Sequence, residues 1–486
     1  MNSIYIQEVE NEILSEISKN YGSKLIDLIG KLPDDQKRIA MFAAISSKKD
    51  TSHKDMLNTL KNDENSVIIK QIDKIIERFR KYIPIGDVEK KSFGEVFTPF
   101  TLVNEMLDTL PVEVWSNPNL KWADLCNGMG NFMIMVVKRL MIGLESWQPN
   151  EAKRYKHIIE NMVYVAELQP KNMFLWMLSV DPKSKLNLNI YTGNSLESGL
   201  DEHMKNVWKV DKFDIIVGNP PYNEGTKGGN GQRDLWDKFI FKFLKIIEKN
   251  GYLVLVHPSK WRRPESEIFN EYKKLNLIYL EIHSKKDGQK IFGAITRYDF
   301  YLLQNSNYSG KTIVIDEKNI KNIININDWN FLPNYNYIDI KNIITLKNEK
   351  SLDIIYSRSA YGNDKKWMSK NKSDEHKYPC IYGMYKDLTC SYYYSSIKND
   401  HFNIPKIILG TGEKLYPLVD INGEYGMMQN SFGIKINSIE DALNIKNAIE
   451  SDKFKKIIES TKWLNFQTDY KMFKYFREDF WKEFID

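Results

Sequence analysis

Cysteine is scarce in this chain: it occupies three of 486 positions, Cys126, Cys380 and Cys390. So few cysteines exclude a disulfide scaffold and are typical of a reducing compartment. No two of them are spaced as a CxxC pair, which argues against a structural zinc site. The sequence therefore predicts a protein without a metal centre.

Long apolar runs are also missing. The longest, such as residues 252–256, are far shorter than the roughly 20 residues that span a bilayer. Glu8, Glu10 and Glu12 lie where a signal peptide would be basic and then apolar. We therefore expect a cytoplasmic protein with no membrane contact.

A strong excess of one charge is absent as well. Sixty-nine Lys and Arg residues stand against 64 Asp and Glu, for a net charge of +5. This balance leaves the question of a nucleic-acid partner to local patches. What the chain does have is length, which predicts two to four domains at roughly 100–200 residues per domain.

Three regions differ in their residue patterns. Residues 1–85 carry apolar residues at helical spacing. Residues 86–305 alternate short β-like runs with helical patterns, which predicts a mostly parallel sheet covered by helices on both faces. The Asn- and Ile-rich stretch 305–330 is interpreted as compositional drift and as a linker to residues 331–486. The expected strands are 122–126, 162–167, 188–192, 213–218, 251–257, 277–282 and 298–303.

The tetrad Asn219-Pro220-Pro221-Tyr222 follows the apolar run 213–218. Two prolines cannot continue a central strand, so the tetrad should lie at the carboxyl edge of the sheet, where open α/β sheets bind ligands. The Asn219 oxygen and the Pro220 carbonyl can each accept an N–H of an adenine amine, and Tyr222 can stack on the base. The alternative reading is an ordinary turn that caps a strand.

A second candidate site lies between a predicted strand and a predicted helix, in the loop Asp124-Leu125-Cys126-Asn127-Gly128-Met129-Gly130. Gly128 and Gly130 permit a ligand to approach the backbone at the helix N-terminus. The next strand ends in Glu167, which can hold ribose hydroxyls. The strand after that is followed by Asn194, which can bond an adenine edge.

Together these motifs resemble the amino-type DNA methyltransferases that use S-adenosylmethionine to modify adenine N6, in their gamma motif order. The upstream segment Phe93-Gly94-Glu95-Val96-Phe97-Thr98-Pro99 matches the family element that closes over the methionine part of the cofactor. Thr98 and Pro99 also suit an N-cap and a first helical position. Two departures are Leu125, where the family usually has proline, and Asn194, where it usually has an acid.

The resemblance covers roughly residues 86–305 and assigns roles to individual residues. It implies cofactor contacts from Phe97, Thr98, Asp124, Gly128, Gly130, Phe132, Glu167 and Asn194. It implies that Asn219, Pro220 and Tyr222 hold the target base and that Phe292, in the segment 291–296, stacks on it. A core phenylalanine beside a strand is the alternative for Phe292.

The implied fold class is α/β: a Rossmann-like methyltransferase sheet with an N-terminal helical region and a C-terminal α+β target-recognition domain. The corresponding ranges are 1–85, 86–305 and 331–486. The implied partners are double-stranded DNA and a cognate restriction endonuclease, in a prokaryotic cell or on a phage or plasmid. The role of residues 1–85 is not assigned.

DNA contact is expected at two places beside the tetrad. The glycine-rich loop 223–231 is expected to be a mobile lid or DNA-contacting loop, or else a surface loop. Lys260, Arg262 and Arg263 cluster after a strand end and are expected to meet phosphates. The alternative for this cluster is a solvated charged face.

The sequence thus predicts a site-specific DNA adenine-N6 methyltransferase that acts on a flipped base. Two alternatives remain open at this point. One is a methyltransferase for RNA adenine or protein glutamine, because the tetrad also occurs there. The other is a DNA-binding restriction subunit with a non-catalytic methyltransferase fold.

Overall fold

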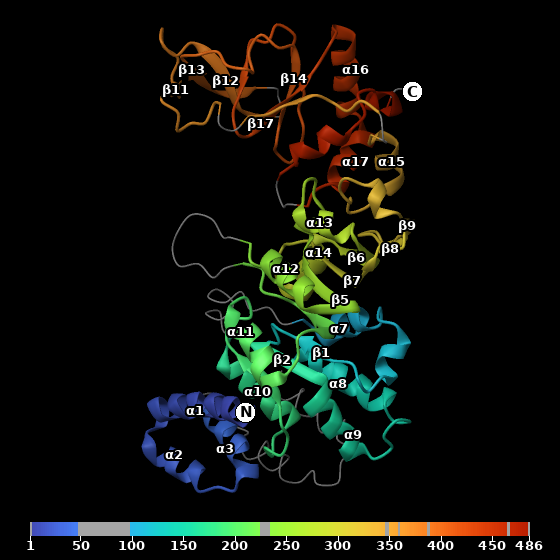
Figure 1. The fold of residues 1–486 in the computed structure, drawn as a ribbon. Helices are drawn as coiled ribbons and strands as arrows, with labels where there is room; N and C mark the ends of the chain where they lie inside the picture. Colours follow the sequence, from blue (N-terminus) through green and yellow to red (C-terminus); the bar gives the residue numbers. More distant parts are fainter. Residues whose placement is uncertain are drawn as a thin grey trace.

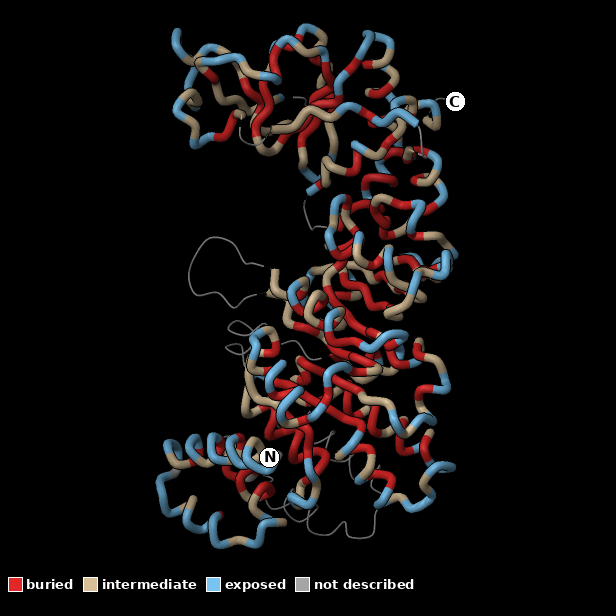
Figure 2. Tube along the Cα trace, in the orientation of Figure 1, coloured by how far each residue is buried: buried red, intermediate tan, exposed pale blue. Residues whose placement is uncertain are grey.

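The structure, a computed structural model, describes residues 2–46, 98–223, 234–345, 349–357, 360–385, 389–463 and 467–484. The chain is elongated, with the N-terminal helices at one end, a large sheet in the middle and the C-terminal region at the other end (Figure 1). Buried residues concentrate in the central sheet and the layers around it (Figure 2). None of the helices in these ranges is long and apolar enough to cross a membrane.

The central sheet has nine strands in the order β3-β2-β1-β4-β5-β7-β6-β8-β9. They are β1 Trp122–Asp124, β2 Val163–Glu167, β3 Asn189–Thr192, β4 Phe213–Gly218, β5 Ile247–Pro258, β6 Leu275–His283, β7 Tyr298–Asn307, β8 Thr312–Ile315 and β9 Lys321–Ile324. Strands β1 to β5 pair in parallel, whereas β7 is antiparallel to both β5 and β6. The α/β fold class is confirmed, and all seven expected strands are present in a mixed sheet.

One expectation about this region is wrong. The Asn-rich stretch 305–330 is not a linker, because β8 pairs with β6 and β9 pairs with β8, which extends the central sheet to Ile324. Thr312–Ile315 alternates buried and half-buried residues, as a strand with one covered face should. The frequent asparagines conceal this period, since they fill the polar positions and the turns around it.

Helices cover both faces of the sheet, and the strand residues alternate between the two layers. Ile215 and Val217 point into the layer formed by α7 Phe100–Leu107, α8 Asn131–Gly143, α9 Glu151–His157 and α10 Pro170–Val180. Ile216 points into the opposite layer, with α11 Ser198–His203, α12 Trp236–Ile246 and α13 Glu267–Tyr272. This alternation is the period of two that a doubly covered sheet requires.

Residues 2–46 of the N-terminal region form three helices, α1 Asn2–Tyr21, α2 Ser23–Gly30 and α3 Asp34–Ser46. Their apolar residues, Val9, Ile13 and Ile17 among them, join the same buried cluster as α8 and α10. The helical pattern expected between residues 47 and 85 lies outside the described residues.

The C-terminal region contains two four-stranded sheets. One has the order β10-β17-β14-β15, and the other β11-β13-β12-β16. Their strands are β10 Ile354–Ile355, β11 Met368–Ser369, β12 Tyr378–Met384, β13 Cys390–Ser395, β14 Lys406–Gly410, β15 Leu418–Asp420, β16 Gly426–Met427 and β17 Ser431–Lys435. Three helices flank them: α15 Tyr337–Ile343, α16 Ile439–Glu450 and α17 Asp452–Ser460.

A buried arginine joins the central sheet to the C-terminal region. Arg262 is fully buried and pairs with Asp299 of β7 through Nε at 2.7 Å and Nη2 at 3.1 Å. Its Nη1 donates to the carbonyls of Leu332 and Pro333, each at 2.9 Å, and its Nη2 donates to Asn334 at 2.8 Å. A charge this deeply buried is tolerable because all of its donor groups are engaged.

Candidate active site

The site lies where the strand order of the sheet reverses. From β1 the chain continues outward through β2 and β3, then returns to place β4 on the other side of β1. Asp124 ends β1 and Gly218 ends β4, so the loops that follow them face each other at the carboxyl edge. A Cβ at position 218 would lie 2.9 Å from Asp124 Oδ1, so only glycine permits this approach.

Backbone N–H groups bind both carboxylates at this edge. Asp124 Oδ1 accepts from the Cys126 N–H at 3.0 Å, and Glu167 Oε2 accepts from the Gly128 N–H at 2.8 Å. Gly130 precedes α8 with a φ of 92°, and a Cβ there would lie 2.5 Å from the ring of Trp176. The structure therefore brings together four residues that the sequence singled out: Asp124, Gly128, Gly130 and Glu167.

The two carboxylates share a desolvated environment. Burial raises the pKa of Asp124 to about 8, and the nearby Glu167 contributes to the same shift. Burial also raises the pKa of Glu167, although N–H donors from Gln169 and Gly128 oppose that shift. This arrangement suits a ligand that brings hydroxyl donors or a positive charge.

Several polar side-chain atoms beside the carboxylates are buried and lack a hydrogen-bond partner among the described residues. They are Nδ2 and Oδ1 of Asn127, Nε2 of Gln169 and Oγ1 of Thr192. Such atoms are costly inside a protein unless a ligand or water satisfies them. The sequence reading missed all three residues, although each lies within three positions of an assigned motif residue.

The remaining cofactor assignments differ in where the structure places them. Asn194 bonds within its own loop, accepting from the Leu196 N–H at 3.0 Å and donating to Glu197 Oε1 at 2.8 Å. Phe132, in the first turn of α8, is 4% exposed and joins the buried cluster on that side of the sheet. Phe97 lies outside the described residues.

Thr98 joins the three motifs. Its hydroxyl accepts from Asn219 Nδ2 at 3.2 Å, and its carbonyl accepts from Asn131 Nδ2 at 2.8 Å. The expectation that Thr98 caps the next helix is wrong. Pro99 has extended dihedrals and is itself the N-cap of α7, which begins at Phe100, so the Thr98 hydroxyl is directed to Asn219 instead.

The two aromatic residues assigned to the target base, Tyr222 and Phe292, have different neighbours. Tyr222 is half-buried, and burial raises the pKa of its hydroxyl, with further contributions from Tyr298 and Asp299. Phe292 ends α14 Lys285–Phe292 and meets Tyr298 edge-on, with ring centroids 4.9 Å apart. Phe292 and Tyr298 thus pack in the layer of Ile215, whereas Tyr222 packs against the opposite layer.

The two ends of the loop after the tetrad are held together. The Leu235 N–H donates to the Tyr222 carbonyl at 3.0 Å, and Asn223 pairs with Asp234 in an isolated antiparallel bridge. Apart from Asn223, the glycine-rich loop 223–231 lies outside the described residues.

The three basic residues after β5 have different surroundings. Arg262 is fully buried with its guanidinium bonded to Asp299 and to the 332–334 segment, so its expected phosphate contact is wrong. Lys260 is partly exposed and pairs with Asp234 at 2.9 Å. Arg263 is also partly exposed and lies 3.9 Å from Asp469. The three basic residues that are neighbours in the sequence thus have different roles in the structure: Arg262 is a buried structural residue, and the other two lie at the surface.

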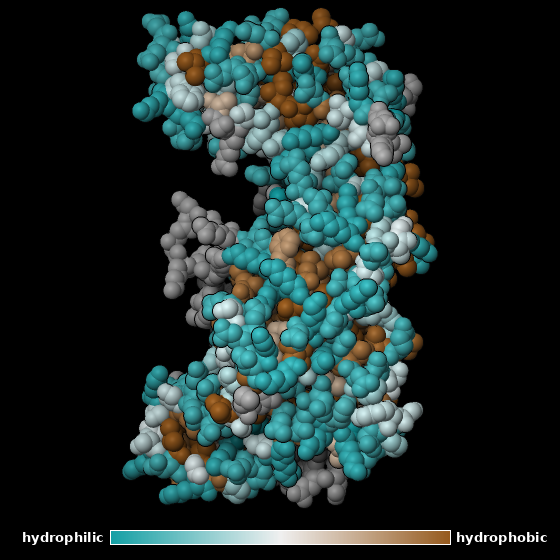
Figure 3. Space-filling model, viewed as in Figure 1, coloured by the Kyte–Doolittle hydropathy of each residue, from teal (hydrophilic) through white to brown (hydrophobic). Residues whose placement is uncertain are grey.

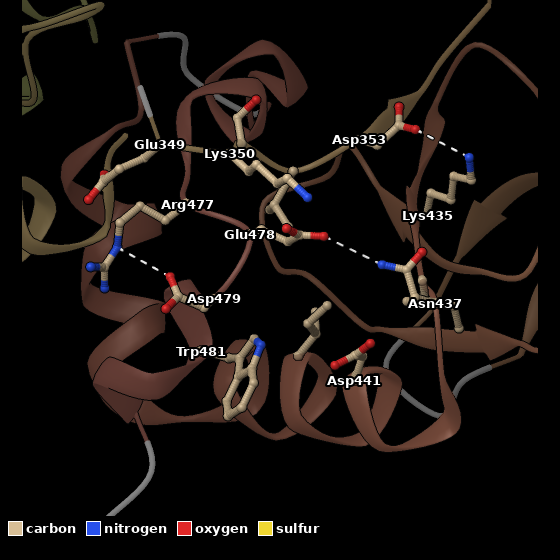
Figure 4. A pocket seen from close by; sticks show the side chains of 14 residues that line it. Glu349, Lys350, Asp353, Lys435, Asn437, Asp441, Arg477, Glu478, Asp479 and Trp481 are labelled. Atoms are coloured by element: carbon tan, nitrogen blue, oxygen red, sulfur yellow. Dashed lines mark hydrogen bonds and ion pairs between the residues drawn. The ribbon is translucent and has the colours of Figure 1, made fainter. Parts of the chain in front are cut away.

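A separate cavity of about 570 Å³ lies in the C-terminal region, between α16 and the chain around residue 478. Its lining carries five carboxylates and three basic side chains, which include the pairs Asp353–Lys435 and Arg477–Asp479 (Figure 4). None of its lining residues belongs to the motifs described above. In the part of the chain that the structure describes, no cluster of three His, Cys, Asp or Glu residues could hold a metal ion.

Comparisons with known proteins indicate a similarity to DNA-modification methylases. Residues 134–292 match the family described as Eco57I restriction-modification methylase. An uncharacterized adenine-specific methylase of Mycoplasma pneumoniae is 26% identical, over 45% of this chain and 69% of the relative. Modification methylase CviBIII of Paramecium bursaria Chlorella virus NC1A is 32% identical, over 22% of this chain and 30% of the relative.

The fold also has a counterpart among solved structures. The Type IIL restriction-modification enzyme MmeI in complex with DNA aligns with 88% of this chain and 73% of its own, with a TM-score of 0.50 and 10% identity. At that identity the likeness concerns the fold alone. Residues 134–292 therefore resemble the Eco57I-type methylases of restriction-modification systems, and the first of the two relatives is named as an adenine-specific methylase.

Proposed function

We propose that this protein transfers a methyl group from S-adenosylmethionine to the N6 amine of an adenine flipped out of double-stranded DNA at a specific sequence. The observation that carries this proposal is the junction at Thr98, which bonds to Asn219 of the tetrad and to Asn131 at the start of α8. Through this junction the cofactor side and the target side share one edge of the sheet. A transfer reaction needs such alignment of its two reactants more than any other contribution.

The donor set beside β1 and β2 supports this cofactor. Two buried carboxylates suit ribose hydroxyls and a cationic sulfonium, and the unsatisfied polar atoms of Asn127, Gln169 and Thr192 suit further polar contacts. When bound, S-adenosylmethionine supplies an electrophilic methyl group. Asp124 and Glu167 would hold it, while Gly128 and Gly130 leave room at the backbone.

The tetrad supports binding of an exocyclic amine. The bond from Asn219 Nδ2 to Thr98 fixes which way the amide is turned, so that Oδ1 is the atom presented as an acceptor. Oδ1 and the Pro220 carbonyl would then accept the two N–H groups of adenine. This favours a tetrahedral nitrogen with its lone pair directed at the methyl group. No shifted pKa is required, because the proton leaves after the methyl group has moved.

Base flipping is required by the position of the site. A base stacked in a duplex cannot reach a half-buried tetrad at the edge of a sheet. Tyr222 and Phe292 would stack on the extruded base, since aromatic rings suit a planar π-face.

The duplex would lie between the C-terminal region and the central sheet. The surface is hollowed between these two parts and is mostly hydrophilic there (Figure 3). Lys260 and Arg263 are candidates for phosphate contacts, because each is partly exposed at the end of β5. The C-terminal region, from residue 331 onward, would then read the bases.

The test is methylation-sensitive sequencing of DNA from cells that express the protein, with Asn219→Ala as the inactive control. We expect N6-methyladenine at one recurring sequence with the wild-type chain and none with the variant. Unmodified DNA adenine in cells that express the wild-type chain, with or without modified cytosine, would refute the proposal.

A further inference from the structure

The N-terminal helices, whose role the sequence does not assign, contact the central sheet beside β3. Helix α1 lies against α10 and β3 (Figure 1). Arg38 of α3 is 2% exposed and donates to Glu10 of α1 at 2.6 Å and to the Asp181 carbonyl at 2.6 Å. The three N-terminal helices are therefore fixed to the end of α10.

The residue that Arg38 holds organises the entry to β3. Asp181 follows α10, and its carboxylate accepts from the N–H groups of Lys185 at 2.8 Å and Leu186 at 3.1 Å. Arg38 Nη1 approaches the same carboxylate at 3.1 Å. Through Asp181, the turn that leads into β3 is thus bonded to Arg38 of the N-terminal helices.

A second contact reaches the far end of β3 through aromatic rings. Tyr5 of α1 meets His203 edge-on at 4.3 Å, and His203 lies 5.1 Å from Tyr191 of β3. His203 is buried, and burial lowers its pKa to about 4, so the ring is uncharged at neutral pH. It acts as an aromatic spacer between α1 and β3, with Trp208 on another side at 4.9 Å.

Tyr191 in turn covers the loop that follows β3. A Cβ at Gly193 would lie 2.8 Å from the Tyr191 hydroxyl, and one at Gly199 would lie 2.6 Å from it. The hydroxyl therefore rests against both ends of the segment 193–199, called here the loop 193–199, which contains Asn194 and the first two residues of α11. Thr192, whose buried hydroxyl lacks a partner among the described residues, immediately precedes this loop.

We propose that α1 supports the conformation of the loop 193–199. Through this support the N-terminal helices set the affinity for S-adenosylmethionine. Tyr5 is a positioning residue: it supports His203, which supports Tyr191, which covers the loop. This inference rests on the proposed function, because it takes the carboxyl ends of β1 to β3 as the cofactor site. It concerns binding alone, because the tetrad that holds the amine follows β4.

The test is the affinity of the full chain for S-adenosylmethionine by titration calorimetry, with Tyr5→Ala, Tyr5→Phe and Glu12→Ala compared with wild type. An aromatic pair contributes enough that Tyr5→Ala should weaken binding by about threefold to tenfold. Tyr5→Phe keeps the ring and should bind like wild type. Glu12 is exposed on the same helix and is the matched control.

Kinetics and thermal melting separate this role from mere support of folding. Tyr5→Ala should raise KM for S-adenosylmethionine by the same factor, while kcat and KM for DNA stay unchanged. If Tyr5→Ala does not fold, Tyr5→Leu keeps an apolar side chain, removes the ring contact and should show the same weakening.

Two results would overturn the proposal that α1 supports this loop. One is a variant that melts at a lower temperature but binds S-adenosylmethionine like wild type, and the other is a fall in kcat with unchanged affinity. If the wild-type chain itself binds no S-adenosylmethionine, the proposed function fails, and the inference fails with it.

Discussion

The two halves of the site are built from different chemistry. The half beside β1 and β2 is acidic and desolvated, with Asp124 and Glu167 bonded to backbone N–H groups. The half beside β4 and β7 offers an amide and aromatic rings, with Asn219 turned by Thr98 and Phe292 packed on Tyr298. Both halves lie at one edge of one sheet, and substitutions in the two halves should be separable in kinetics.

The largest effect is expected in the half beside β4 and β7. Asn219→Ala removes the side-chain acceptor for the amine, so methyl transfer should fall by at least about a hundredfold, as when one such group is lost from a preorganised site. Affinity for S-adenosylmethionine should not change, since the cofactor half is intact. Single-turnover methylation and titration calorimetry measure the two quantities. Asn119→Ala, at an exposed asparagine before β1, is the control, and near wild-type transfer by Asn219→Ala would contradict the assigned role.

The next effect concerns the acidic half. Here we expect weaker binding of S-adenosylmethionine with an unchanged rate of transfer. Glu167→Gln keeps the shape but removes the charge that accepts from Gly128 and Gln169. Hydrogen bonds to a charged group contribute enough that affinity for S-adenosylmethionine should fall by about tenfold or more. The rate at saturating cofactor should remain close to wild type. Glu145→Gln, at an exposed position, controls for charge, and a fall confined to kcat would break the division between the halves.

A smaller effect concerns pH and stability without cofactor. The folded pKa of Asp124 is about 8, well above its ordinary value of 3.8. Between these values the unfolded chain ionises while the folded chain keeps the proton, so this group makes the folded state less stable as pH rises. Asp124→Asn removes the dependence. Its melting temperature relative to wild type should therefore increase from pH 5 to pH 8, whereas that of the exposed Asp211→Asn should not. Parallel melting curves for Asp124→Asn and wild type would contradict the shift.

The smallest effect tests the junction between the halves. Thr98→Val removes the hydroxyl that accepts from Asn219 while keeping the side-chain volume. One hydrogen bond contributes about 0.5–1.5 kcal/mol, so kcat should fall by a few-fold. Thr98→Ser keeps the hydroxyl and should restore the rate. Equal loss in both variants would mean that the junction depends on packing instead of this bond.

Local patterns predict the central part of this fold well. The seven strands of residues 86–305 and the order of the motifs follow from apolar runs and from prolines and glycines at their ends, all of which are short-range signals. The clustering of Asp124, Gly128, Glu167 and Asn219 also follows, because carboxyl ends of parallel strands meet at one edge.

Long-range partners explain where prediction fails. Arg262 reads as a surface charge because its neighbours in sequence are basic, yet its partners Asp299 and Leu332–Asn334 are distant in the chain and bury it completely. Thr98 reads as a helix cap because that rule is local, yet its hydroxyl bonds to Asn219, 121 residues away. In both cases the tertiary partner outweighs a correct local preference.

The most direct test of the account is nucleoside mass spectrometry of duplex DNA incubated with purified protein and S-adenosylmethionine carrying a labelled methyl group. We predict label in N6-methyladenine with the wild-type protein. The Asn219→Ala variant should give no label although the variant still binds the cofactor. Label in cytosine, or no label from a wild-type protein that binds S-adenosylmethionine, would contradict it.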